Sequence, residues 1–449
     1  MKYKPNVVLV FADQWRAQAT GYTGDVNVKT PHLDALSKES LNFTHAVSNC
    51  PVCSPFRGSL MTGQYPLTHG VFVNDVQLNT EAASLGKIFS EAGYDTAYIG
   101  KWHLDGNGRS SYIPPERRQG FSYWKALECT HDYNHSAYYA GVGGEQRHWE
   151  EYDAFAQTQD ALQYIQTCET DKPFLLVLSW GPPHNPYETA PQVYRDLYVP
   201  EDIVLRPNVP ASMAEEARRW LAGYYAHCTA LDSCVGQIGD LLRSQGLEND
   251  TIFLFTSDHG DMLGSQGEQR KQRPWDESVR IPFLLHCPGA SGREPGPCEA
   301  PVSAPDIMPT LLGLCGIAIP EAVEGLDFSG YVRGGPDPTD AAALLLCPHP
   351  FGEWTTARHA GRAYRGLRTR RHTYVRDLNG PWLLYDNSED PFQQRNLVQE
   401  PGQASLIRSL EEQLRHKRSL LADDFLPGME YIRRWGYNVD ESGTVPYKN

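Results

Sequence analysis

The sequence contains no uninterrupted apolar run long enough to span a bilayer, which excludes a transmembrane helix. Near the start, residues 7–12 are too short for the apolar region of a signal peptide, and no small-residue cleavage site follows them. We therefore expect a cytoplasmic protein with no membrane partner. If a leader was removed from the sequence, a periplasmic or secreted protein is expected instead.

Positive charge is also scarce, with 40 Lys and Arg against 55 Asp and Glu and a net charge of -15. This balance excludes a protein that coats nucleic acid, because such binding depends on Lys and Arg neutralising phosphates. A polyanionic substrate would need a locally basic pocket. The oligomeric state cannot be read from the sequence.

The ten cysteines lack the dense, regular spacing of a small secreted scaffold, so we expect reduced thiols. Cys50 and Cys53 form a C-x-x-C pair, which could be a redox pair or half of a zinc site. No second C-x-x-C completes a structural zinc site. The sequence also has no internal repeats and no low-complexity tract.

Short apolar runs alternate with segments of helical period, which is typical of a sheet flanked by helices. At 449 residues, the chain can bury one large core and carry a second, smaller unit. The pattern predicts strands at residues 7–12, 96–100, 174–180, 251–256 and 282–287. It predicts helices at residues 31–37, 55–62, 84–92, 213–244 and 304–314. The expected fold class is α/β, a mixed sheet flanked by helices.

The pattern changes after a Gly- and Pro-rich stretch, residues 325–338, which we interpret as a crossing between two units. Beyond it we predict short strands at residues 364–367, 372–375 and 382–385, and a helix at residues 403–421. These boundaries predict a catalytic α/β domain at residues 1–340 and a smaller α+β domain at residues 341–449.

Reactive side chains follow four of the predicted strands at their carboxyl ends. Because open α/β sheets bind ligands at that edge, we expect these side chains to share one site. They are Asp13 after the first strand, Lys101 and His103 after the second, His184 after the third, and Asp258 and His259 after the fourth.

The sharpest motif is the eleven-residue stretch from Cys53 to Gly63, which reads C-x-P-x-R-x4-T-G. Pro55 favours a helix that begins just after Cys53, which places residue 53 at the positive end of a helix dipole. The stretch matches the formylglycine signature at every fixed position, and the chain resembles the type I sulfatases over nearly its whole length. The resemblance implies the alkaline-phosphatase-like fold.

This resemblance implies that a separate maturation enzyme oxidises Cys53 to formylglycine. In the family, one hydroxyl of the aldehyde hydrate attacks sulfur and expels the alcohol. The other hydroxyl then drives out sulfate as the aldehyde re-forms. An unmodified thiol cannot perform this second step.

The resemblance also places one divalent cation on Asp13, Gln14, Asp258 and His259, with residue 53 as a further ligand. Most relatives have paired acids where this chain has Asp13 and Gln14. The combination of Gln14 with His259 resembles the choline-sulfatase and phosphonate-monoesterase branch. Oxygen ligands favour Ca²⁺, and the single imidazole leaves Mn²⁺ and Mg²⁺ as alternatives.

The same resemblance implies that Arg57, Lys101 and Lys271 stabilise the negative charge that builds on the nonbridging and leaving oxygens of the sulfate ester. Lys101 and His103 contact the formylglycine hydroxyls, and His103 takes a proton during sulfate elimination. His184 is the expected acid for the leaving alcohol, shared with Lys271.

Two segments are candidate walls of the substrate site. Residues 121–152 are rich in aromatics and histidines, including His131 and His135, and either stack on sugars or pack on their own domain. Residues 358–376 carry seven arginines, Arg368 among them. These either hold further anionic groups or form a solvated face that pairs with residues 386–390. Asn74 and Asp75 either face the sugar or form a turn.

We therefore expect a sulfuric ester hydrolase acting on a sulfated small molecule or glycan. The alternatives are a phosphonate monoester or phosphodiester hydrolase, or a choline-sulfatase-like enzyme, with the same formylglycine and metal set. A non-catalytic glycan-binding relative would lack one or more catalytic groups, whereas every expected group is present here.

Overall fold

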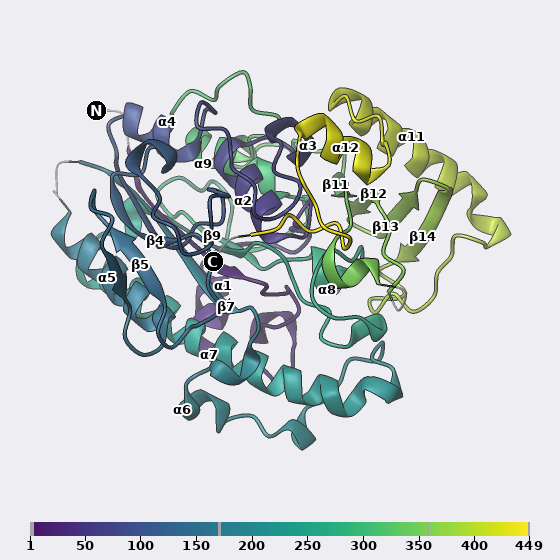
Figure 1. Ribbon diagram of the computed structural model, residues 1–449, viewed down its shortest axis with the longest axis horizontal. Coiled ribbons are helices and arrows are strands. Elements are labelled where there is room, and N and C mark those ends of the chain that lie inside the picture. Colours follow the sequence, from purple (N-terminus) through teal and green to yellow (C-terminus); the bar gives the residue numbers. More distant parts are fainter. Residues whose placement is uncertain (1–3, 169–171, 357–358, 448–449) are drawn as a thin grey trace.

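In the computed structural model, which describes residues 4–168, 172–356 and 359–447, a ten-stranded mixed sheet runs through the larger part of the molecule (Figure 1). The strand order is β10-β2-β9-β8-β1-β7-β3-β4-β5-β6. The strands are β1 (Asn6–Asp13), β2 (Leu41–Phe43), β3 (Asp95–Lys101), β4 (Tyr123–Leu127), β5 (Ala137–Ala140), β6 (Gln146–His148), β7 (Phe174–Pro183), β8 (Thr251–Ser257), β9 (Phe283–His286) and β10 (Gly296–Cys298).

Strand β1 lies at the centre, parallel to β7 on one side and β8 on the other. Its side chains alternate between two apolar layers: Leu9 and Phe11 point to one, and Val8 and Val10 to the other. Burial on both faces explains why the strand is an unbroken apolar run. Strand β3 is parallel to β7, so four central strands end at the same edge.

Helices cover both faces of this sheet (Figure 1). Helices α2, α4 and α9 pack on the face of Leu9, and α1, α5 and α7 on the face of Val8. The helices are α1 (Pro31–Lys38), α2 (Cys53–Thr62), α3 (Pro66–His69), α4 (Leu85–Glu91), α5 (Asp153–Thr167), α6 (Gln192–Arg195), α7 (Ala214–Ser244), α8 (Asp276–Val279), α9 (Ala304–Leu314), α10 (Ser329–Val332), α11 (Ala404–Leu420) and α12 (Gly428–Trp435). Among the described residues, no helix combines the length and apolar character needed to cross a bilayer.

A second, antiparallel sheet lies towards the C-terminus, in the order β11-β12-β13-β14. Its strands are β11 (Ala342–Cys347), β12 (Tyr364–Thr369), β13 (His372–Asp377) and β14 (Gly380–Asp386). Leu344, Leu367 and Leu384 join the same apolar layer as Leu9. The smaller sheet therefore shares the core of the larger one.

The expected fold class is confirmed, and each predicted strand and helix is present with ends shifted by a few residues. Helix α5 was not predicted, because the face that it buries includes Asp153, Gln157 and Thr158 as well as apolar residues. Strand β11 was also missed, and the stretch at 325–338 contains α10 rather than only a crossing. The domain boundary at residue 340 stays a prediction.

The arginine-rich segment is largely occupied by ion pairs with carboxylates. Arg368 is 2% exposed and donates two hydrogen bonds to Asp276, at 2.9 and 3.0 Å. The guanidinium of Arg368 is therefore buried against this partner, and a contact of Arg368 with substrate stays a prediction. Arg371 pairs with Asp386, as the alternative reading expected, and Arg358 lies outside the described residues. The other pairs are Arg362–Asp377, Arg365–Asp423, Arg370–Asp337 and Arg376–Glu411.

We predict that Arg368→Ala lowers the free energy of unfolding by about 3–5 kcal/mol, because it leaves the buried Asp276 carboxylate without its bidentate partner and with only the longer ion pair to Arg280, at 3.5 Å. Chemical denaturation at neutral pH measures this change. Arg371→Ala is the matched control, since Arg371 has 57% of its side chain exposed and its pairing with Asp386 is screened by water. Equal losses of unfolding free energy in the two variants would contradict the assignment of Arg368 to a buried ion pair with Asp276.

Candidate active site and metal centre

The predicted reactive side chains converge at the carboxyl edge of the central strands. Asp13 ends β1, Lys101 ends β3, His184 follows β7, and Asp258 with His259 follows β8. Cys53 is the first residue of α2, whose amino end meets this edge. Lys271 reaches the same point from the loop before α8, within 2.9 Å of Cys53 Sγ.

Four of these side chains form one buried cluster that suits a metal ion. The ligand atoms of Asp13, Cys53, Asp258 and His259 all lie within 4.8 Å of one another. His259 Nε2 lies 3.6 Å from Asp13 Oδ1 and 3.5 Å from Asp258 Oδ1. His259 Nδ1 lies 2.9 Å from the carbonyl oxygen of Gly260, to which it donates, so the lone pair of Nε2 faces the cluster.

The side chain of Gln14 completes this arrangement. Residue 14 has a φ of 72°, and its Nε2 donates to Asp261 Oδ2 at 2.7 Å. Among the described residues, its Oε1 is buried without a hydrogen-bond partner. A buried amide oxygen without a donor is costly unless a cation or water satisfies it. The donor set of two carboxylates, one amide oxygen and one imidazole therefore fits a divalent cation.

The electrostatics of the two carboxylates also indicate a cation. Burial raises the pKa of Asp258 above its ordinary value, and the neighbouring Asp13 raises it further. Burial acts on Asp13 in the same sense, but Lys101 holds the pKa of that carboxyl well below its ordinary value. Two carboxylates at this distance repel each other, so Asp258 in particular needs further positive charge.

Cys53 is surrounded by Lys101, Lys271 and His259 and is only 1% exposed. Its Sγ is 3.3 Å from His259 Nε2 and accepts a hydrogen bond from Lys271 Nζ. Burial and Asp13 would raise the pKa of the thiol, but Lys101, Lys271 and His259 lower it well below its ordinary value. Position 53 is therefore built to carry a negative charge.

Arg57 lies behind the ligand carboxylates and is fully buried. Its Nη2 donates to Asp13 Oδ2 and Asp258 Oδ2, both at 3.3 Å, and its Nη1 donates to Lys101 O and Ser179 Oγ. These contacts fix the carboxylates. A direct contact of Arg57 with sulfate stays a prediction. Lys101 Nζ lies 2.6 Å from Asp13 Oδ2.

His184 and Lys271 form a hydrogen-bonded pair beside Cys53. His184 Nδ1 donates to the carbonyl oxygen of Asn185 at 2.8 Å, and its Nε2 accepts from Lys271 Nζ at 3.1 Å. Burial and the Lys271 charge lower the pKa of His184 well below its ordinary value, so the ring is neutral at pH 7. The neutral His184 ring therefore accepts the hydrogen bond in this pair, and Lys271 donates it.

Some of the predicted substrate residues lie beside the site and others lie away from it. His131 stacks on His184, with ring centroids 4.7 Å apart, and so lies beside the site. His135 instead stacks on His148, with ring centroids 4.3 Å apart. Among the described residues, the cluster around Cys53 is the only group of three or more His, Cys, Asp or Glu side chains that could hold a metal ion. Asn74 Oδ1 accepts a hydrogen bond from the Ser54 N–H at the start of α2. Asp75 accepts one from His103.

Three supporting residues were not anticipated. Asp261 orients Gln14, Ser179 holds Arg57, and buried Glu128 accepts backbone hydrogen bonds from residues 104 to 106 beside His103. Asp261 could have been found, because it ends the stretch that begins with Thr256 and contains Asp258 and His259. No local signal marks Ser179 or Glu128.

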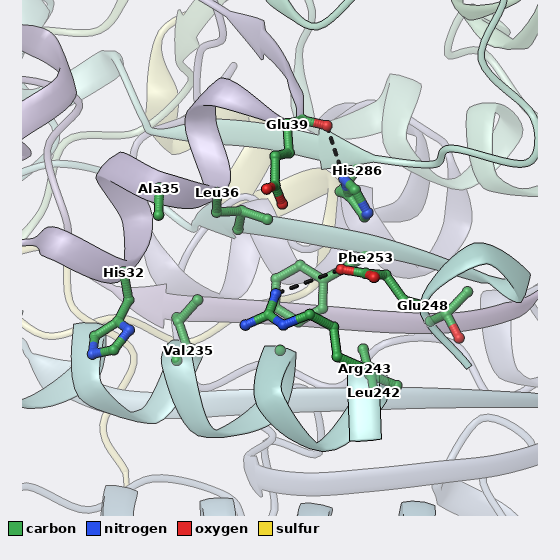
Figure 2. A pocket seen from close by; sticks show the side chains of 13 residues that line it. His32, Ala35, Leu36, Glu39, Val235, Leu242, Arg243, Glu248, Phe253 and His286 are labelled. Atoms are coloured by element: carbon green, nitrogen blue, oxygen red, sulfur yellow. Dashed lines mark hydrogen bonds and ion pairs between the residues drawn. The ribbon is translucent and has the colours of Figure 1, made fainter. Parts of the chain in front are cut away.

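A separate cavity of about 250 Å³ lies between α1, α7 and the beginning of β8 (Figure 2). Phe253 and Leu36 line it together with Arg243, which pairs with Glu248. The cluster of candidate metal ligands lies beyond the opposite end of β8, and none of the predicted site residues lines this cavity.

Comparisons with known proteins agree on one family. The family model described as Sulfatase matches residues 5–317, and the model described as N-sulphoglucosamine sulphohydrolase, C-terminal, matches residues 264–420. The chain is 46% identical to an ulvan-active sulfatase of Formosa agariphila, over 99% of this chain and 87% of that protein. It is 33% identical to an endo-4-O-sulfatase of Bacteroides thetaiotaomicron, over 88% of each.

Among solved structures, the fold is similar to that of a phosphonate monoester hydrolase of Agrobacterium radiobacter. The TM-score is 0.77 at 23% identity, covering 99% of this chain and 100% of that chain. At this identity, the likeness concerns the fold alone.

We predict that Asp261→Asn lowers the affinity for a divalent cation by about 10–100-fold, because Gln14 loses the carboxylate that turns its amide oxygen to the cluster. Isothermal titration calorimetry of metal-stripped protein with Ca²⁺, Mn²⁺ and Mg²⁺ measures this change. Asp232→Asn is the matched control, since Asp232 is a buried carboxylate that accepts backbone hydrogen bonds at α1. Unchanged affinity in Asp261→Asn would contradict the role given to Gln14.

Proposed function

The chain belongs to the sulfatase family and hydrolyses sulfate esters, and from that membership we propose that its substrate is a sulfated carbohydrate. The structural observation that supports hydrolysis is the buried cluster of Asp13, Asp258 and His259 around Cys53 at the amino end of α2. The likeness to an ulvan-active sulfatase and to an endo-4-O-sulfatase supports a glycan substrate.

Members of this family generally use formylglycine and a divalent metal. Formylglycine supplies a hydrated aldehyde whose hydroxyl is the nucleophile, and the cation supplies Lewis acidity towards the sulfate oxygens. We assign Asp13, Gln14, Asp258 and His259 as the protein ligands of the cation, with residue 53 beside it. The oxygen-rich donor set favours Ca²⁺ over Mn²⁺ or Mg²⁺. A formylglycine-generating maturase is the implied partner for Cys53.

Three cationic groups face position 53. Lys101 and Lys271 lower the pKa of the Cys53 thiol, and the same charges stabilise any anionic group held there. Burial would lower the pKa of His103, but Cys129, Asp75 and Cys53 together raise it to about 10. In the unconverted protein, a protonated His103 therefore adds positive charge to the site at neutral pH.

The leaving alcohol requires a proton, and the geometry favours Lys271 as the group that supplies it. Lys271 donates to both His184 Nε2 and Cys53 Sγ, whereas the neutral ring of His184 has its only N–H bonded to the Asn185 carbonyl. His184 thus positions the ammonium group. His131 stacks on the His184 ring.

The second candidate function is hydrolysis of a phosphonate monoester or phosphodiester, and choline sulfate is a further candidate substrate. Gln14 and His259 in the ligand set and the shared fold support this alternative. Sulfate and phosphonate monoesters share tetrahedral geometry, so kcat/KM values on a common panel separate the two functions.

We predict that co-expression with a maturase removes the sulfur from residue 53, which mass spectrometry of the tryptic peptide detects. The converted enzyme should show its highest kcat/KM on one sulfated monosaccharide among a panel that includes an aryl sulfate and an aryl phosphonate.

Cys53→Ala should reduce turnover to background. Cys50→Ala is the matched control, because Cys50 is equally buried and should keep its activity. Preference for the phosphonate would favour the alternative.

We further predict that Lys271→Ala lowers kcat on a sugar sulfate by about 10²–10³-fold, because the sugar alkoxide needs a proton to leave. On 4-nitrophenyl sulfate the loss should be about tenfold or less, since nitrophenolate leaves without protonation. Arg270→Ala is the control, because Arg270 has 41% of its side chain exposed and pairs with Glu353. Equal losses on the two substrates would rule out proton donation by Lys271.

A further inference from the structure

A chain of contacts links His103 to the C-terminal segment of the protein. His103 Nε2 lies 3.3 Å from Asp75 Oδ1. Arg109 Nε and Nη2 donate to Asp75 Oδ1 and Oδ2 at 2.9 and 2.8 Å, which is a bidentate pair. The ring of Tyr447 lies over the Arg109 guanidinium, 3.4 Å from its central carbon.

We propose that Asp75 and Arg109 are positioning residues that orient the ring of His103, and that Tyr447 completes this arrangement by holding Arg109. The inference rests on the proposed function, because it assigns the side chains that act through His103 in sulfate-ester hydrolysis. It replaces the expectation that Asp75 contacts the sugar.

The geometry at His103 explains why its ring needs support. His103 and Asp75 are non-glycine residues with positive φ, 58° and 62°, a conformation that costs energy unless neighbouring contacts maintain it. Because Nε2 is bonded to Asp75, only Nδ1 remains for position 53. Among the described residues, this Nδ1 is buried without a hydrogen-bond partner. Asp75 therefore selects which nitrogen of His103 faces the reacting group.

Arg109 fixes Asp75 in turn. Both oxygens of Asp75 are engaged by the planar guanidinium, so the carboxylate cannot rotate away from His103. The Asp75 side chain is 5% exposed and that of Arg109 is 18% exposed. Arg109 is thus the more exposed member of this ion pair, and the Tyr447 ring covers its guanidinium.

The C-terminal segment reaches this position from the second sheet, as the yellow trace running to the centre of Figure 1 shows. Several contacts anchor it on the way. Tyr437 Oη donates to the Gly70 carbonyl at 2.9 Å, and the Gly352 N–H donates to the Ser442 carbonyl at 2.9 Å. His349 Nε2 donates to the Gly443 carbonyl at 3.0 Å. Tyr447 is therefore placed by a fixed path, although its own ring is 47% exposed.

The test compares kcat and KM of converted enzyme variants on the substrate that the wild-type enzyme prefers. Asp75→Asn should lower kcat by about 10–100-fold, with KM changed by about twofold or less, because His103 loses its orientation rather than the substrate losing a contact. Arg109→Ala should lower kcat by about tenfold, and Arg109→Lys should recover part of this loss. Tyr447→Ala should lower kcat by about threefold, and Tyr447→Phe should match the wild type.

Tyr331→Ala is the matched control, because Arg293 stacks on Tyr331 at 3.8 Å in another part of the fold. It should leave kcat unchanged. A raised KM with unchanged kcat in Asp75→Asn would overturn the proposal, since it would show that Asp75 binds substrate directly. Unchanged kcat in both Arg109→Ala and Tyr447→Ala would also overturn it.

A crystal structure of the Arg109→Ala variant provides a readout that needs no turnover. The His103 ring should be rotated away from Asp75, and an unmoved ring would overturn the proposal. If the converted wild-type enzyme hydrolyses no ester on the panel while the ring does rotate, the proposed function fails and the positioning role of Arg109 stands.

Discussion

The structure depends on the compensation of one buried charge, the carboxylate of Asp13. Because β1 runs between β7 and β8, its last residue is enclosed on every side and fully buried. A carboxylate in this position is stable only with partners, and Lys101 from β3 and Arg57 from α2 supply them at 2.6 and 3.3 Å. These two ion pairs tie β3 and α2, and hence Cys53, to the end of β1.

The central sheet could be predicted because burial on both faces makes its strands continuous apolar runs, as in residues 7–12. Once the strands are recognised, the residues that follow them can be predicted to meet at one edge of the sheet. The sequence does not show which side chains contact one another. Arg368 and Asp75 each carry a charge that suits an anionic sugar or a sugar hydroxyl, and only the fold shows that they meet Asp276 and Arg109 instead. Residues 121–152 hold strands β4, β5 and β6, which are three to five residues long and too short for their alternation to be recognised; β6 is exposed throughout.

The second sheet supports the site as well as the core. The Gln272 side chain exchanges two hydrogen bonds with the Phe351 backbone, both at 3.0 Å, and Glu268 accepts one from His359. These contacts bracket Lys271, so the loop that carries it is fixed from the C-terminal part of the chain.

The hydrogen bond between the Gln14 backbone and Asp258 joins residues 244 positions apart, and it has a consequence for biosynthesis. Chains are made from the N-terminus, so β1 and α2 emerge from the ribosome well before β8 exists to pair with them. The cluster around Cys53 therefore cannot be complete until β8 has left the ribosome, because Asp258 and His259 follow that strand.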